Sequence, residues 1–197
     1  MIDGNRCSVF AAVLAVSFSA AAQDGGVPQT PIELPKPPPE LEQLKPLEGS
    51  WSCKGTVPAG AMGPGSPEQS YRSTMKMKKS LDGFWYMTDY EEKKTKTHPV
   101  AVKAHGPLGF DPVARKFILL SVDSMGGYVT ETSAGWEGDK LVITGDGVVM
   151  GQKSTLRDTV TLKGKNELVW ASDLKTGGAA DFTSMGEQRC KRREDRP

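Results

Sequence analysis

Residues 154–174 read STLRDTVTLKGKNELVWASDL, and apolar and polar side chains alternate on both sides of one short turn. The apolar residues that carry this alternation are Leu156, Val160, Leu162, Leu168, Trp170 and Leu174. A period of two places successive side chains on opposite faces of a strand. The intervening Lys163-Gly164-Lys165-Asn166 has the composition of a hairpin turn. The segment therefore predicts two antiparallel strands with one apolar and one wetted face.

The same alternation continues through most of the chain. Met75 and Met77, for example, alternate with Lys76 and Lys78. The pattern predicts about ten strands, near residues 48–57, 70–79, 84–93, 99–105, 116–123, 127–134, 139–145, 153–162, 167–174 and 181–191. A long up-and-down sheet tends to curl until its edges meet. We therefore expect an all-β fold, an antiparallel up-and-down barrel of about ten strands with a short N-terminal helix.

Two cysteines lie near the two ends of the strand-forming segment. Cys53 and Cys190 both fall on the inward-facing side of their predicted strands. Because closure of the barrel makes the first and last strands neighbours, we expect a Cys53–Cys190 disulfide. A pair of reactive thiols or a metal site is the alternative, although no histidine accompanies the two cysteines closely.

The first 22 residues resemble a secretory signal peptide. Arg6 precedes an uncharged, mostly apolar stretch over residues 7–22, which ends with the small residues Ala20 and Ala22. The stretch is shorter and less apolar than the roughly 20 residues that a membrane helix needs, and an uncleaved anchor is the alternative. Cleavage would remove Cys7, and it predicts a periplasmic or secreted protein without a membrane span.

The remainder of the chain divides into a linker, a domain and a tail. Residues 23–40 are rich in proline and have no hydrophobic period, which predicts a disordered linker. A short helix over 39–45, ended by Pro46, leads into a barrel domain at 41–192, and a basic tail follows at 193–197. The net charge of +1 gives the chain no electrostatic footprint for nucleic acid.

Several short motifs resemble one group of exported barrels. Leu44–Gly55 (LKPLEGSWSCKG) resembles the opening of lipocalin-like barrels, in which a short helix leads into Gly-x-Trp on the first strand. Leu81–Trp85 (LDGFW) and Gly106–Pro112 (GPLGFDP), interpreted as a hairpin, resemble two later segments. Residues 41–192 are thus similar to a bacterial exported domain-of-unknown-function family of calycin-like (lipocalin- and nitrobindin-like) β-barrels. This resemblance implies the barrel fold and no particular activity.

Haem is considered as a cofactor because nitrobindin-type barrels bind it, and it is disfavoured. Cys53 stands where that family has a further glycine, and the family's haem-ligating histidine lies near the C-terminal strand. Here the chain has only His98 and His105, and no histidine follows them. Fatty-acid carriers use a lumenal arginine pair, whereas Arg157 and Arg189 fall on the outward side of their predicted strands.

The inward side of the predicted strands also identifies candidate ligand-lining residues. They are Trp51, Met75, Met77, Tyr86, Phe117, Asp158, Trp170 and Phe182. Asp158 is the polar member, since it lies between Leu156 and Val160 on the apolar face, and a buried carboxylate needs a partner. It is either a polar anchor in the lumen, or it makes a structural hydrogen bond or is turned outward by a β-bulge.

These observations favour a binding protein over an enzyme. The chain has no serine in a nucleophile elbow, no phosphate-binding glycine loop and no metal-ligand spacing of histidines, so we predict no catalytic or metal site. The expected partner is a small hydrophobic or amphipathic molecule in the lumen. One alternative is a hydrolase or isomerase with Asp158 or His105 as a lumenal base. The other is a filled barrel that acts as an interaction or structural protein.

Overall fold

The structure of the chain is a computed structural model that describes residues 34–194. All of its helices and strands belong to the unit that begins at Lys36. The predicted signal peptide lies outside the described residues, as does the predicted linker up to residue 33. Within residues 34–194, no helix has the length and apolar character that crossing a membrane requires.

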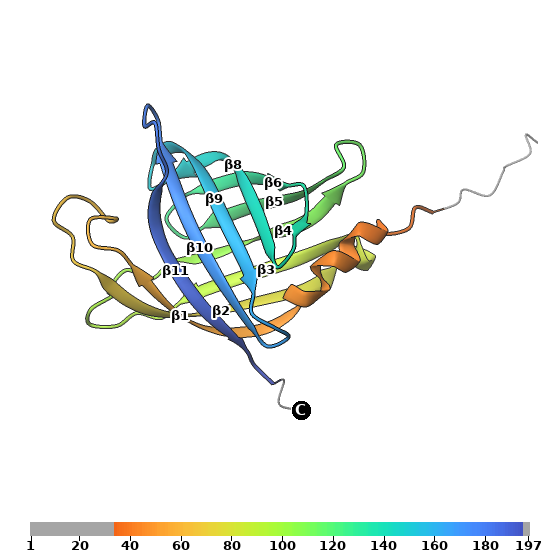
Figure 1. The fold of residues 1–197 in the computed structure, drawn as a ribbon, viewed down its shortest axis with the longest axis horizontal. Helices are drawn as coiled ribbons and strands as arrows, with labels where there is room; N and C mark the ends of the chain where they lie inside the picture. The colour runs from red at the N-terminus through yellow and green to blue at the C-terminus, as the bar shows by residue number, and fades with distance from the viewer. Residues whose placement is uncertain (1–33, 195–197) are drawn as a thin grey trace, which may run out of the picture. The chain divides into compact units, whose positions relative to one another are not determined.

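Strands make up most of the regular structure. They are β1 (Gly49–Val57), β2 (Gln69–Ser80), β3 (Trp85–Glu92), β4 (Lys103–Asp111), β5 (Lys116–Asp123), β6 (Tyr128–Ser133), β7 (Trp136–Glu137), β8 (Lys140–Val149), β9 (Gln152–Leu162), β10 (Glu167–Thr176) and β11 (Thr183–Arg192). Their spatial order is β6-β5-β4-β3-β2-β1-β11-β10-β9-β8, and β6 also pairs with β8, which closes the sheet (Figure 1). The short β7 pairs only with the start of β8. The predicted antiparallel barrel of ten strands is confirmed.

The first and last strands of the barrel are joined as the cysteines predict. In the antiparallel pair of β1 and β11, Cys53 lies directly opposite Cys190. Their Sγ atoms are bonded at 2.02 Å. The predicted disulfide is therefore present, and both of its cysteines are buried in the core.

The N-terminal helix is longer than predicted. It is a 3-10 helix, η1 (Pro39–Leu47), which continues through Pro46 instead of ending before it. A 3-10 helix has three residues per turn, so Leu41, Leu44 and Leu47 lie on one face. All three are buried and belong to the same cluster as the barrel core. Burial of this leucine face explains why the helix extends to Leu47.

Arg192, at the end of β11, holds η1 against the barrel. Its guanidinium donates hydrogen bonds to the carbonyl oxygens of Pro46 and Glu48, and its Cζ lies 4.2 Å from the ring centroid of Trp51. The Trp51 Nε1–H in turn donates to the Leu47 carbonyl at 3.0 Å. These bonds satisfy carbonyl groups that the end of a helix leaves unpaired.

The barrel interior is packed at the end that η1 covers. Large buried side chains fill this half, among them Leu44, Leu47, Trp51, Tyr86, Phe117, Leu141 and Leu168. Toward the opposite end the inward positions include the small residues Ser121, Ser172 and Gly186. The interior is therefore filled in one half and hollow in the other.

β4 is the strand whose predicted position was wrong. The sequence predicts a strand at 99–105 and a hairpin at 106–112, whereas β4 runs from Lys103 to Asp111 and contains most of the expected hairpin. A Cβ atom at Gly106 would lie 1.7 Å from the Leu120 carbonyl oxygen on β5. Glycine thus allows β4 and β5 to approach closely here, which is a common reason for glycine within a strand.

Gly145 lies at the seam where β8 meets β6. A Cβ atom there would be 1.9 Å from the Thr130 carbonyl oxygen and 2.5 Å from the Glu131 Cα. We expect Gly145→Ala to lower the free energy of unfolding by about 1–3 kcal/mol, because backbone atoms must move. Gly177→Ala is the control, since its nearest atom would be 3.7 Å away. Urea unfolding measures both variants, and equal midpoints would contradict this close approach.

Candidate ligand-binding site

A cavity of about 330 Å³ occupies the hollow half of the barrel. This volume lies at the lower end of the roughly 300–1,000 Å³ typical of small-molecule sites. Apolar side chains form much of its wall, among them Met75, Met77, Leu156 and Trp170. Polar side chains, among them Glu131 and Asp158, complete the wall. An apolar wall with a few convergent polar groups is the usual construction of a ligand site.

Two carboxyl groups lie in the wall of this cavity. Glu131, on β6, is 1% exposed, and neither of its carboxyl oxygens has a hydrogen-bond partner. Asp158, on β9, is 7% exposed, and its Oδ1 accepts a hydrogen bond from the Ser172 hydroxyl at 2.5 Å. The strand between them is β8, where the residue opposite Glu131 is Gly145. Glycine places no side chain beside Glu131, and the buried carboxyl of Glu131 lies in the wall of the cavity.

The surroundings of these carboxyls favour their neutral form. Burial raises the pKa of Glu131, and the charge of Asp158 adds to this effect. Burial also raises the pKa of Asp158, while hydrogen bonding from Ser172 and Trp170 partly offsets it. Among the described residues that line the cavity, none is a lysine or an arginine. No lysine or arginine within this lining therefore stabilises the carboxylates.

A second polar cluster lies around the end of β3. Glu92 accepts a hydrogen bond from the Tyr90 hydroxyl at 2.9 Å, and its Oε2 lies 2.9 Å from His98 Nε2. His98 Nδ1 lies 3.2 Å from Gln69 Oε1, and its ring stacks on Tyr71. Burial raises the pKa of Tyr71 to about 12. Both ring nitrogens of His98 are engaged, so neither can ligate a metal without breaking one of these contacts.

The eight predicted lumen residues separate into three groups. Those that line the cavity are Met75, Met77, Asp158 and Trp170. Those that fill the packed half are Trp51, Tyr86 and Phe117. The remaining residue, Phe182, lies on the outer surface of the barrel. The alternation along each predicted strand therefore assigned all of these residues except Phe182 to the correct side of the sheet. It did not distinguish the packed half of the barrel from the hollow half.

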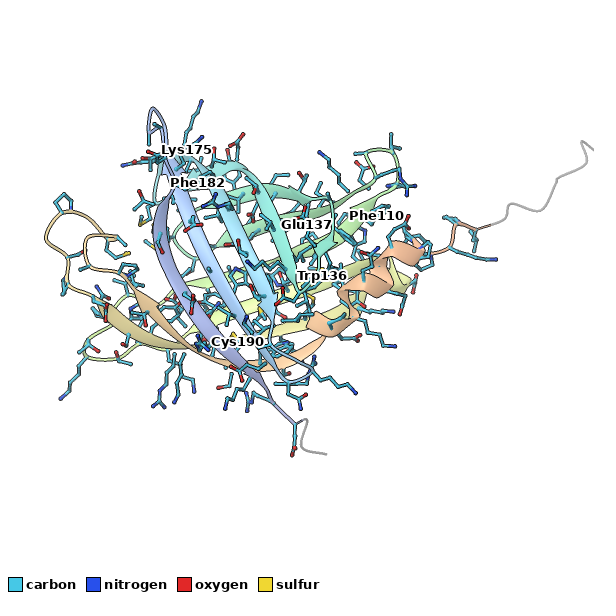
Figure 2. The ribbon with its side chains drawn as sticks, in the orientation of Figure 1. Phe110, Trp136, Glu137, Lys175, Phe182 and Cys190 are labelled. Atoms are coloured by element: carbon cyan, nitrogen blue, oxygen red, sulfur yellow. A yellow bond between two sulfur atoms is a disulfide. The ribbon has the colours of Figure 1, made fainter. Side chains whose placement is uncertain are left out.

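Phe182 faces outward, contrary to its predicted side. Its ring centroid lies 4.2 Å from Cζ of Arg157 and 5.3 Å from Nζ of Lys175 (Figure 2). Arg157 also pairs with Asp173, with 2.8 Å between Nη2 and Oδ2. The register between β10 and β11 shifts by one residue between Ser172 and Asp173. Such a bulge moves the residues before it to the opposite face of the sheet, and Phe182 directly precedes the first residue of β11.

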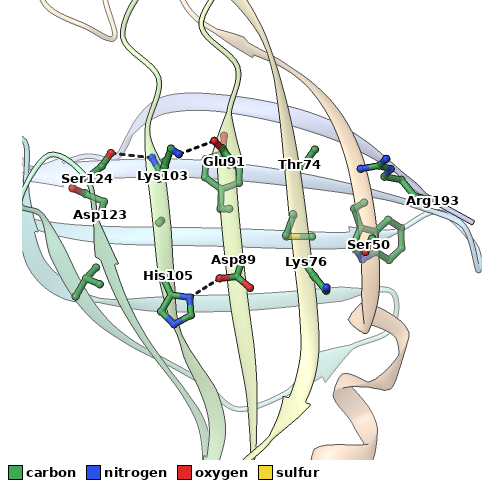
Figure 3. Close-up of a pocket in the computed structure, with 15 residues that line it drawn as sticks. Ser50, Thr74, Lys76, Asp89, Glu91, Lys103, His105, Asp123, Ser124 and Arg193 are labelled. Carbon is green, nitrogen blue, oxygen red and sulfur yellow. Dashed lines mark hydrogen bonds and ion pairs between the residues drawn. The ribbon is translucent and has the colours of Figure 1, made fainter. Parts of the chain in front are cut away.

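His105 lies in a groove on the outer face of the barrel, over β1 to β5 (Figure 3). Its Nδ1 lies 2.6 Å from Asp89 Oδ1, and the neighbouring Lys103 Nζ lies 2.8 Å from Glu91 Oε1. All four side chains are more than half exposed, and they pair with one another. A lumenal base therefore cannot be His105, and Asp158 is the remaining candidate for that hypothesis.

Comparison with known proteins concerns the family and the fold. Residues 36–192 match the family described as "Protein of unknown function (DUF1579)". Among solved structures, the chain is similar to that of Rv2717c from M. tuberculosis, with a TM-score of 0.63 and 16% identity over 81% of this chain and 100% of that chain. At this level of identity the similarity shows the fold alone. Among curated proteins, none matches this sequence.

Proposed function

Because the chain belongs to the family described as "Protein of unknown function (DUF1579)", we propose its function from the geometry of the barrel: it binds one small amphipathic molecule in its lumen. The observation that carries this proposal is the cavity of about 330 Å³, with its apolar wall and two inward carboxyl groups. Protein interiors are normally close-packed. Some barrels of eight or more strands enclose such a space and hold a small ligand in it.

We further propose that the protein acts outside the cytoplasm, in the periplasm or as a secreted protein. The pattern of residues 1–22 supports export, because a positive charge precedes an apolar stretch with small residues at its end. The Cys53–Cys190 bond supports it as well, since disulfides persist mainly in oxidising compartments.

Titration with n-decanol, a neutral amphiphile, tests binding in the lumen. We expect saturable binding of one molecule per chain by isothermal titration calorimetry. We also expect a change in tryptophan fluorescence, because Trp170 lines the cavity. Ser121→Phe should abolish binding, since Ser121 also lines the cavity and a phenyl ring there would occupy it.

Val122→Phe is the matched control, because Val122 is the next residue on β5 and is 56% exposed. It also lines the outer groove that contains His105. Binding that survives Ser121→Phe but is lost in Val122→Phe would place the ligand in the outer groove and contradict the proposal.

A further inference from the structure

The chemistry of the ligand follows from the two carboxyl groups of the lumen, and this inference rests on the proposed function. We propose that the barrel selects a positively charged amphiphile. Its ammonium group lies between Glu131 and Asp158, and its apolar part fills the remainder of the cavity.

The charge of the lumen is the first argument. Besides Glu131, its titratable groups are Tyr71, Tyr90, Glu92, His98, Asp123, Tyr128 and Asp158. Together with Glu131, four lumenal groups are carboxyls, and within the described lining the only group able to become positive is His98. An anionic ligand would therefore meet repulsion without a lysine or arginine to offset it.

The partners of the other carboxyls are the second argument. Glu92 already accepts a hydrogen bond from Tyr90 and contacts His98. Its Oε2 also accepts from the backbone N–H of Val102 at 2.9 Å. Asp123 accepts two backbone N–H groups of the turn that follows β5. Both carboxylates are thus held by the protein itself.

Glu131 differs from those two carboxylates, because neither of its oxygens has a partner. Asp158, the second carboxyl of the proposed site, accepts a hydrogen bond on Oδ1 from the Ser172 hydroxyl. A buried polar atom without a hydrogen bond is costly, so a ligand that satisfies it gains affinity. An ammonium group offers three N–H donors and a positive charge, whereas a hydroxyl offers one donor and a carboxylate offers none.

Binding of an ammonium group should also release a proton. In the empty lumen, burial and the neighbouring carboxyl favour the protonated form of Glu131. An adjacent positive charge favours the carboxylate instead. On binding, the O–H bond of the carboxyl group breaks and its proton passes to the buffer, while the ammonium group keeps its own protons. A neutral alcohol causes no such release.

Calorimetry on the whole protein with n-decylamine, n-decanol and n-decanoate tests the inference near neutral pH. We expect n-decylamine to bind about tenfold more tightly than n-decanol, because hydrogen bonds to charged groups are the stronger ones. n-Decanoate should bind most weakly. Titrations in buffers of different ionisation enthalpy should show release of about one proton per bound amine and none per bound alcohol.

Glu131→Gln should weaken n-decylamine binding about tenfold and abolish the proton release, while n-decanol affinity changes less than about twofold. Glu137→Gln, an exposed position on β7 (Figure 2), should leave both affinities unchanged. The comparison of buffers needs no variant, so it decides the question even if Glu131→Gln does not fold.

The outcomes separate the two proposals. Binding of n-decanol or n-decanoate as tight as that of n-decylamine overturns the inference about charge and leaves lumen binding in place. Amine binding without proton release overturns it too. If none of the three amphiphiles binds, the proposed function itself fails.

Discussion

Replacing Glu131 with glutamine should stabilise the barrel by about 2–4 kcal/mol at mildly alkaline pH and should reduce the fall of its stability with rising pH. The carboxyl group has an ordinary pKa of 4.5, and burial raises this pKa in the folded chain. Above that ordinary value, the unfolded chain loses a proton that the folded chain retains. Stability then falls by about 1.4 kcal/mol per pH unit until the folded carboxyl also ionises. Glutamine has a similar shape and does not titrate.

Urea unfolding at about pH 5 and about pH 8 measures this effect. At the lower pH the variant and the unmodified chain should differ by less than about 1 kcal/mol, because pH 5 lies only slightly above the ordinary pKa of 4.5 and ionisation then stabilises the unfolded chain only a little. Glu137→Gln should keep the slope of the unmodified chain, since Glu137 is exposed. Asp158, whose pKa is also raised by burial, accounts for the slope that remains in Glu131→Gln. Identical slopes in all three proteins would show that Glu131 ionises freely in the folded state.

The period-two pattern predicted most of the barrel because each correct strand also determines which residues face inward. In the segment 154–174, Asp158, Val160 and Leu168 were assigned to the inward face, and all three are buried. The alternation therefore favoured an inward Asp158, with an outward turn at a β-bulge as the alternative. Its hydrogen bond with Ser172, a residue of the neighbouring strand, depends on the register between β9 and β10 and could not be predicted from the sequence.

β4 shows where local rules fail. A Gly-Pro pair normally marks a turn, yet Gly106 and Pro107 lie inside this strand. Pro107 pairs with Met87 of β3, while the ladder between β4 and β5 skips both positions. The missing N–H of proline therefore costs no ladder hydrogen bond on the β5 side. This depends on the neighbouring strand, which a turn rule does not consider.

Glu131 was not identified because its strand carries no readable pattern. β6 reads YVTETS, and its inward face consists of Val129, Glu131 and Ser133. Polar and apolar residues occur on both faces, so neither face is marked as the core. The pairing with β8 buries Glu131 and places Gly145 beside it. That pairing closes the barrel and is a tertiary contact, so alternation within one strand cannot reveal it.

Loss of the Cys53–Cys190 bond should lower the free energy of unfolding by about 2–5 kcal/mol. The two cysteines are 137 residues apart, so the bond restricts nearly the whole domain in the unfolded state. The double variant Cys53→Ala with Cys190→Ala removes the bond without leaving a single thiol. Alanine also avoids placing a hydroxyl group where both side chains are buried. Urea unfolding of the double variant and of the unmodified chain measures the difference.

Reductant separates the contribution of the crosslink from that of the side chains. If the bond acts mainly by restricting the unfolded chain, the unmodified protein in reductant should unfold at nearly the same urea concentration as the double-alanine variant. The variant should still fold, because β1 and β11 remain paired along six register positions and the core around Trp51 and Leu168 is intact. A double-alanine variant as stable as the oxidised chain would show that strand pairing and packing alone hold β1 and β11 together.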